Sequence, residues 1–138
     1  GVSAGQPALP LPAEPMYYLT SEVLNGATVF DFETNKTTGI YDLEELWGRD
    51  PYDLFLSGAA ALQVIENPAC DTGRELVIFR DSFGSSMAPL LVPGYSKVTL
   101  VDLRYFSSML LPQFVPAQGQ DVLFLLSPGI LNSVNLIK

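Results

Sequence analysis

A serine stands where a buried strand is expected to turn into a helix. The apolar run Glu75–Phe79 predicts the strand, and Asp81 and Ser82 follow shortly after it. In such a turn the Ser82 hydroxyl is exposed, and the N–H groups of Phe83 and Gly84 point toward any oxyanion that forms there. Gly84 would also let a substrate approach the backbone closely. Ser82 is therefore a candidate nucleophile, although the commoner role of Asp81 or Ser82 at this place is that of a helix N-cap.

The chain has no histidine, so it cannot supply a complete Ser-His apparatus by itself. A serine hydroxyl needs a positioned base, whose help is typically worth about 10²–10⁴-fold in rate. The remaining candidates for this base are Asp81, which is expected to be turned away into a cap, and Asp102, an ordinary carboxylate. We therefore expect the chain as given to hydrolyse activated acetyl esters no faster than its Ser82→Ala variant.

Two carboxylates offer a different chemistry. Asp102 and Arg104 follow the apolar run Lys97–Val101, so in a parallel sheet they reach the same edge as Asp81. Asp81 and Asp102 could hold Mg²⁺ while Arg104 meets a phosphate. However, Phe83 stands where an Asp-x-Asp motif would have its second acid, and an Asp102–Arg104 ion pair is the more ordinary interpretation. We predict neither a metal nor a cofactor.

The composition argues against several function classes. The net charge is −8, and residues 1–66 carry all of the acidic excess, with ten acids against two bases, so no basic stripe is available for nucleic acid. The single cysteine, Cys70, cannot form a disulfide within the chain, and without histidine a Cys/His zinc site is excluded. The tyrosines and the tryptophan could stack on sugars, although such side chains more often pack in or against a core.

Three apolar runs predict the strands of a sheet. They are Glu75–Phe79, Lys97–Val101 and Asp121–Leu126, and helix-length segments separate them. This order indicates mutually parallel strands joined by right-handed crossovers. Ser127 follows the third run, so it is expected at the same edge as the other polar residues.

Helices are expected between and after these strands. The first lies within Phe83–Val92, where Pro89 should kink it or start a new turn. The second lies within Arg104–Phe114 and must end near Pro112, and a final short helix is expected within Gly129–Lys138.

The amino-terminal half carries a different pattern. Alternating apolar character in Ala27–Phe32, a turn at Thr34–Thr37 and the segment Gly39–Leu43 predict a β-hairpin. A short helix is expected at Asp42–Trp47. The segment Ala59–Ile65 fits either a helix or a strand, and its length and β-branched end favour a strand.

Several sequence blocks together resemble a known family. The blocks RDSFGSSMAPLL, GYSKVTLVDLRYF and DVLFLLSPGILN recur in order, and PYDLFLSG precedes them. Over roughly residues 50–135 they resemble the carboxyl-terminal part of the DHHW family. That family is related to the SGNH-type acyltransferases and esterases that include the alginate O-acetylation proteins. The sequence departs from the family pattern at Arg80, Gly84 and Ser85, where Lys, Ala and Asn are usual.

The resemblance implies a role for each candidate residue. Ser82 would be the nucleophile, Phe83 and Gly84 would stabilise the oxyanion, and Asp102 and Arg104 would shape the floor of the site beside Asp81. The histidine and aspartate that complete the triad would come from an Asp-x-His-Trp-like motif upstream, which this chain does not contain. The Asn that is usual at Ser85 would have been a possible side-chain oxyanion donor.

The expected architecture is an α/β domain with parallel-sheet, SGNH-like (flavodoxin-like) layers and an amino-terminal β-hairpin. Residues 1–15 carry four prolines and are expected to form an extended arm. Residues 16–138 are expected to be the carboxyl-terminal part of one such domain. An incomplete sheet would leave an edge uncovered, so we expect a homodimer and the upstream part of the same domain as partners.

Two functions remain open. The resemblance implies transfer or hydrolysis of an acyl group, expected to be acetyl, on a cell-envelope glycan, with a glycan or an acylated small molecule as substrate and an extracytoplasmic location. The alternative is a non-catalytic module of degenerate SGNH fold that binds a glycan or a protein.

Overall fold

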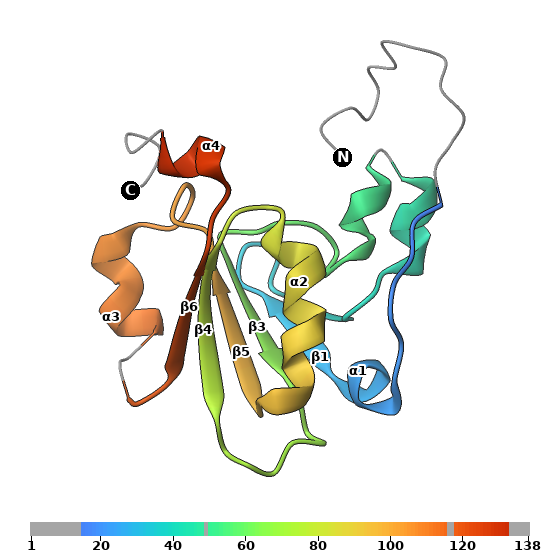
Figure 1. The fold of residues 1–138 in the computed structure, drawn as a ribbon, viewed down its shortest axis with the longest axis horizontal. Helices are drawn as coiled ribbons and strands as arrows, with labels where there is room; N and C mark the ends of the chain where they lie inside the picture. Colours follow the sequence, from blue (N-terminus) through green and yellow to red (C-terminus); the bar gives the residue numbers. More distant parts are fainter. Residues whose placement is uncertain (1–14, 49, 116–117, 133–138) are drawn as a thin grey trace.

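The computed structural model describes residues 15–48, 50–115 and 118–132, which form a six-stranded sheet with helices packed against it (Figure 1). The sheet order is β2-β1-β3-β5-β4-β6. The strands are β1 Thr28–Asp31, β2 Lys36–Gly39, β3 Leu62–Glu66, β4 Glu75–Arg80, β5 Lys97–Val101 and β6 Asp121–Leu125. The α-helices are α1 Glu22–Gly26, α2 Gly84–Leu91, α3 Leu111–Phe114 and α4 Pro128–Leu131, and the 3₁₀ helices are η1 Leu43–Trp47, η2 Pro51–Leu54, η3 Val92–Gly94 and η4 Ser108–Leu110. The predicted α/β class is confirmed, and the proline-rich arm lies almost entirely outside the described residues.

The half of the sheet that was predicted from apolar runs is parallel. β4 pairs in parallel with β5 on one side and with β6 on the other. Two right-handed crossovers that move along a sheet in opposite directions place their connecting segments on opposite faces of that sheet. Accordingly, Ala88 and Val92 pack with one apolar cluster, while Phe106 and Leu111 pack with a second one. The connections after β4 and β5 therefore diverge, and the crevice between their carboxyl ends is where ligands bind in such sheets.

The amino-terminal half adds antiparallel strands, so the whole sheet is mixed. β3 runs antiparallel to both β5 and β1, which in turn pairs with β2. The predicted hairpin exists, but its second strand is Lys36–Gly39 rather than Gly39–Leu43. The turn begins earlier in the sequence than predicted, because Asp31 accepts hydrogen bonds from the backbone N–H groups of Glu33 and Thr34. Asn35 adopts the left-handed backbone conformation (φ 54°), which asparagine tolerates well. The ambiguous segment before Glu66 forms β3, a strand.

The two prolines that were expected to interrupt helices both lie within helical segments. Pro89 lies inside α2 without ending it, and the chain continues from α2 into η3. Pro112 lies in the first turn of α3 rather than at its end, because the first turn is where a missing N–H leaves no bond unmade. The last helix is α4, Pro128–Leu131, and the predicted remainder after Asn132 lies outside the described residues.

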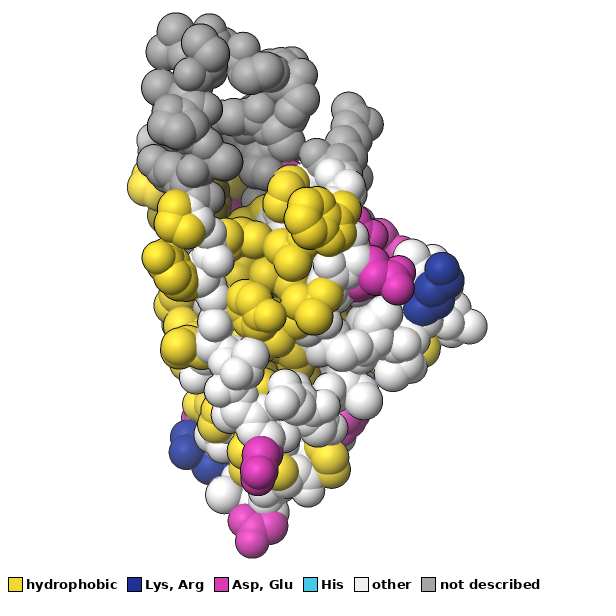
Figure 2. Space-filling view, turned by 90° about the vertical axis from the view of Figure 1, so that its right-hand side faces the viewer, with side chains coloured by type: hydrophobic (Ala, Val, Ile, Leu, Met, Phe, Trp, Pro, Cys, Tyr) yellow, Lys and Arg dark blue, Asp and Glu magenta, His cyan; other side chains and the backbone are white. Residues whose placement is uncertain are grey.

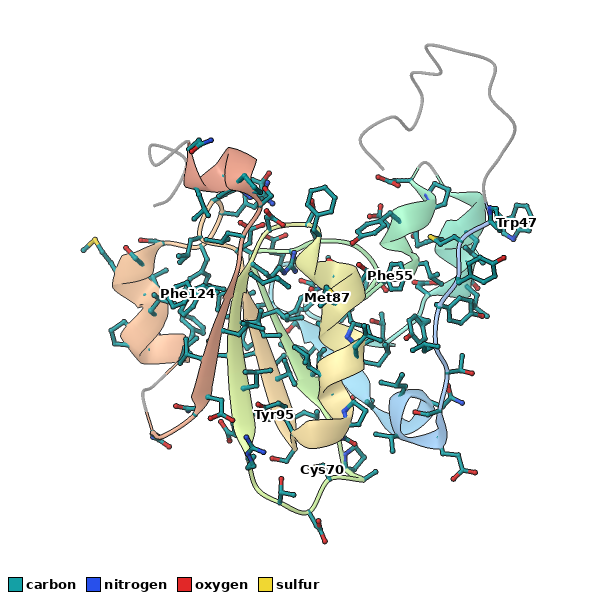
Figure 3. All side chains as sticks on the ribbon, viewed as in Figure 1. Trp47, Phe55, Cys70, Met87, Tyr95 and Phe124 are labelled. Carbon is teal, nitrogen blue, oxygen red and sulfur yellow. The ribbon has the colours of Figure 1, made fainter. Side chains whose placement is uncertain are left out.

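The surface carries large exposed apolar side chains. Val122 and Phe124 of the edge strand β6 are 57% and 64% exposed, although their sequence is typical of a strand buried on both faces. Phe124 is labelled beside β6 in Figure 3. A second group gathers on the face around the first described residues and η1 (Figure 2), where Tyr17 and Trp47 are largely exposed. None of the helices in the described ranges has the length and apolarity to cross a membrane.

Candidate active site

Ser82 lies in the turn between β4 and α2, at the carboxyl edge of the sheet. The turn is closed by hydrogen bonds from the Gly84 N–H to the Asp81 carbonyl (3.0 Å) and from the Ser85 N–H to the Ser82 carbonyl (3.1 Å). Ser82 is half-buried, and its hydroxyl has no hydrogen-bond partner among the described residues. The side chain of Ser82 is therefore not a helix cap, and it remains available for chemistry.

Asp81 connects two strand ends. It is buried, its Oδ1 accepts from the Phe83 N–H (3.1 Å), and its Oδ2 accepts from the Ser127 N–H (2.7 Å). Burial raises the pKa of Asp81, but the hydrogen bonds from Ser127 and Phe83 outweigh it, so the pKa lies below its ordinary value. Asp81 is thus an ionised residue that fixes the turn and joins it to the end of β6.

The N–H groups expected to form the oxyanion site are already in use. Phe83 donates to the Asp81 carboxylate and Gly84 to the Asp81 carbonyl. By contrast, the N–H of Ser82 itself has no acceptor within the part of the chain that the structure describes. The free donor beside the Ser82 hydroxyl is therefore its own backbone amide.

Gly84 is needed for packing rather than for access. A Cβ at this position would lie 2.6 Å from Cβ of Arg80, which is closer than real Cβ atoms approach their neighbours. Gly84 is also buried, so its missing side chain faces the interior. The expectation that Gly84 admits a substrate to the backbone is corrected, because the space belongs to Arg80.

Asp102 and Arg104 form the predicted ion pair. Arg104 binds the carboxylate through Nη2 to Oδ2 (2.6 Å), through Nε to both oxygens, and through its backbone N–H to Oδ1 (3.0 Å). Asp102 is buried, and the hydrogen bond to it raises the pKa of Arg104. Because both oxygens of Asp102 are held by a guanidinium, Asp102 is poorly suited to accept a proton from Ser82. No group of three potential metal-ligating side chains occurs among the described residues.

Two residues that were not predicted as site residues also approach this turn. The Tyr52 hydroxyl lies 2.9 Å from Ser86 Oγ and 3.2 Å from the Phe83 carbonyl oxygen, to which it donates. Ser85, which stands where the resemblance predicts an Asn, is buried, and its Oγ has no partner in the described part of the chain. Tyr52 falls in the block PYDLFLSG, so the resemblance gave a signal for it, whereas nothing in the sequence marks Ser85 as buried.

Comparison with known proteins places this geometry in context. No family model and no curated protein matches the sequence. Among solved structures, a DHHW family protein from Eubacterium siraeum DSM 15702 is 28% identical, with a TM-score of 0.62 over 80% of this chain and 38% of its own. The chain is related to the DHHW family.

The fold is shared more widely. Bacillus cereus PatB1 with a sulfonyl adduct is 20% identical, with a TM-score of 0.54 over 76% of this chain and 38% of its own. PatB1 in a second structure is 21% identical, with a TM-score of 0.53 over 76% and 36%. The DHHW relationship and the SGNH-like fold predicted from the sequence are thereby confirmed. The chain spans less than two fifths of the length of each of these neighbours.

Proposed function

We propose that this chain carries the nucleophile, Ser82, of an SGNH-type enzyme that transfers or hydrolyses an acyl group. The observation that supports this proposal is the state of Ser82. Its hydroxyl and its own N–H are both without partners among the described residues, at the crevice where the connections after β4 and β5 diverge. The backbone N–H groups of Phe83 and Gly84 and the carboxylate of Asp81 are, by contrast, used within the fold.

The geometry suggests the order of steps. Ser82 Oγ attacks the acyl carbonyl carbon, its proton passes to a base, and the carbonyl oxygen becomes an oxyanion that accepts from the Ser82 N–H. Collapse of the tetrahedral intermediate expels the protonated leaving group and leaves an acyl-serine. An acceptor hydroxyl, or water, then attacks this ester and regenerates Ser82. The base comes from polypeptide upstream of this chain, because the chain contains no histidine and Asp102 is held by Arg104.

The second part of the proposal is that the acyl acceptor is a glycan and that the protein is extracytoplasmic. The DHHW relationship supports both statements. The glycan would bind in a surface pocket of about 220 Å³. Aromatic rings line it, and sugars pack their C–H faces on such rings. It reaches α2 one turn beyond Ser82 and is lined by Tyr17, Tyr18, Leu19, Tyr41, Phe55, Ser86 and Leu90.

The test compares p-nitrophenyl acetate hydrolysis by three proteins: the chain as given, its Ser82→Ala variant, and a longer chain that includes the sequence encoded upstream. We expect turnover that depends on Ser82 only in the longer chain. Mass spectrometry after treatment with a sulfonyl fluoride should locate the adduct on Ser82 of the longer chain. Turnover that depends on Ser82 in the short chain would show that a base lies within these 138 residues.

The absence of histidine also supports the second candidate, a binding module without catalysis. In that case neither the chain as given nor the longer chain would hydrolyse the ester in a Ser82-dependent way, and the sulfonyl fluoride would not label Ser82. Binding of cell-envelope glycan fragments by the unlabelled chain would then support the module.

A further inference from the structure

Arg80 is a fully buried arginine two residues before the candidate nucleophile. It is 0% exposed, and it shares the α2 side of β4 with Leu76 and Ile78, which belong to the apolar cluster there. The absent side chain of Gly84 leaves the space that the Arg80 stem fills. Arginine is almost never fully buried unless it is paired, so this position requires an explanation.

The guanidinium is not paired with a carboxylate in the described part of the chain. Asp102, the nearby acid that most favours the charge on Arg80, is bound by Arg104. Burial lowers the pKa of Arg80 against the opposing effect of Asp102. In addition, Nε and Nη1 of Arg80 have no hydrogen-bond partner among the residues that the structure describes, and the same is true of the buried Oγ of Ser85.

The bonds that Arg80 does make lead to a second segment. Nη2 donates to Oε1 of Gln63 (2.9 Å) and to the Ala60 carbonyl (3.3 Å). Gln63 is itself fully buried, and its Nε2 donates to the carbonyls of Leu56 (3.0 Å) and Gly58 (3.3 Å). A continuous buried chain of hydrogen bonds therefore runs from Arg80 through Gln63 to the Leu56–Gly58 turn.

The Leu56–Gly58 turn is strained and needs such support. Leu56 and Ser57 have φ of 60° and 53°, and Gly58 has φ of 95°. A left-handed backbone is unfavourable for a non-glycine residue, because its Cβ comes too close to the following carbonyl oxygen. Strained backbone of this kind persists only where its surroundings hold it, and it clusters at functional sites.

We propose that Arg80 is a positioning residue that locks the Ser82 turn to the Leu56–Gly58 turn through Gln63. The inference rests on the proposed role of Ser82. Replacing a poorly paired buried ion by an apolar side chain of similar size is often neutral or stabilising, so stability alone gives no reason for an arginine here. Its stem packs against Gly84, the first residue of α2. Its guanidinium holds Gln63, which in turn bonds the carbonyls of the Leu56–Gly58 turn, so the Ser82 turn and the Leu56–Gly58 turn keep a fixed distance.

The test uses the longer, active chain with Arg80→Met and Gln63→Leu, singly and together. We expect Arg80→Met to keep or raise Tm while kcat for p-nitrophenyl acetate falls by about 10- to 100-fold and KM stays unchanged, because small misplacements of a reacting group cost this much. Gln63→Leu should lower kcat similarly, and the double variant should lose little more, since both remove one connection. Arg80→Lys should recover part of kcat, because lysine can still reach one acceptor. The matched control is Arg74→Met, an exposed arginine at the opposite edge of the sheet, which should leave kcat unchanged.

A second measurement keeps this inference separate from the proposed function. If Ser82→Ala proves as active as the parent, the proposed function fails, and hydrogen exchange in the 138-residue chain decides the coupling. Arg80→Met should then speed exchange both at Gly58, whose N–H donates to the Phe55 carbonyl, and at Gly84, whose N–H donates to the Asp81 carbonyl. Unchanged kcat in Arg80→Met, with Ser82-dependent turnover intact, would overturn the positioning role, and so would exchange that rises at only one of the two segments.

Discussion

At the scale of single residues, two buried carboxylates at neighbouring strand ends have different tasks. Asp102 is taken up by one guanidinium, whereas Asp81 accepts from two backbone N–H groups on different elements. A carboxylate that accepts two backbone hydrogen bonds is stabilised in its ionised form. Asp81 is therefore the residue that holds the Ser82 turn against the end of β6.

Asp81→Asn should lower the free energy of unfolding by about 1.5–3 kcal/mol at neutral pH, the usual range for hydrogen bonds to a charged group. The native pKa of Asp81 lies below its unfolded value of ~3.9, so the stabilisation is complete above that pH and is lost as the pH falls through the native pKa. Urea unfolding from pH 7 to pH 3 should show the difference between parent and variant shrinking at acid pH. The control Asp71→Asn, at an exposed position, should change stability by no more than about 0.5 kcal/mol. A difference that is constant with pH would contradict the account.

At the scale of elements, α2 approaches β4 closely at its first residue. Gly84 is what allows this approach, because any Cβ there would meet the stem of Arg80. The other side of the same turn is fixed by Tyr52, which bonds to Phe83 and Ser86. Strand, helix and the η2 segment thus meet around Ser82 with little freedom to shift.

Gly84→Ala should destabilise the chain by about 1–3 kcal/mol, the usual cost of overpacking. The matched control is Gly26→Ala at the end of α1, where an added Cβ meets nothing within 4 Å and helix propensity improves. Thermal unfolding should show a lower Tm for the first variant and an equal or higher Tm for the second. Equal behaviour of the two variants would show that α2 can move away from β4 at no cost.

At the scale of the whole molecule, the sheet ends in β6 with an apolar outer strand. Val122 and Phe124 are exposed there, and within the described residues only one edge of β6 is paired, with β4. An unpaired apolar edge is a template for another strand. We propose that the chain alone associates with a second copy here, because antiparallel pairing centred on Leu123 sets Val122 of each copy against Phe124 of the other.

Phe124→Lys should convert such a dimer to a monomer, since it places a charge at the paired edge. Sedimentation over a range of concentrations would measure this. Met109→Lys is the control, because Met109 is 88% exposed and belongs to η4 rather than to the paired edge of β6. A parent chain that sediments as a monomer at high concentration would contradict the proposal.

The sequence by itself determined the parallel strands, the hairpin, the position of Ser82 after β4 and the relationship to the DHHW family. Local sequence patterns indicate these features: apolar runs, turn residues, and short sequence blocks that recur in a fixed order along the chain. Only the tertiary structure decided that the Ser82 amide is the free donor, that Gly84 makes room for Arg80, and that β6 is an edge. The physical reason is that these properties depend on partners far along the chain: Gln63 and Arg80 are 17 residues apart, and Asp81 and Ser127 are 46 apart. Composition and periodicity do not encode which distant groups use up a donor, fill a space or cover a strand.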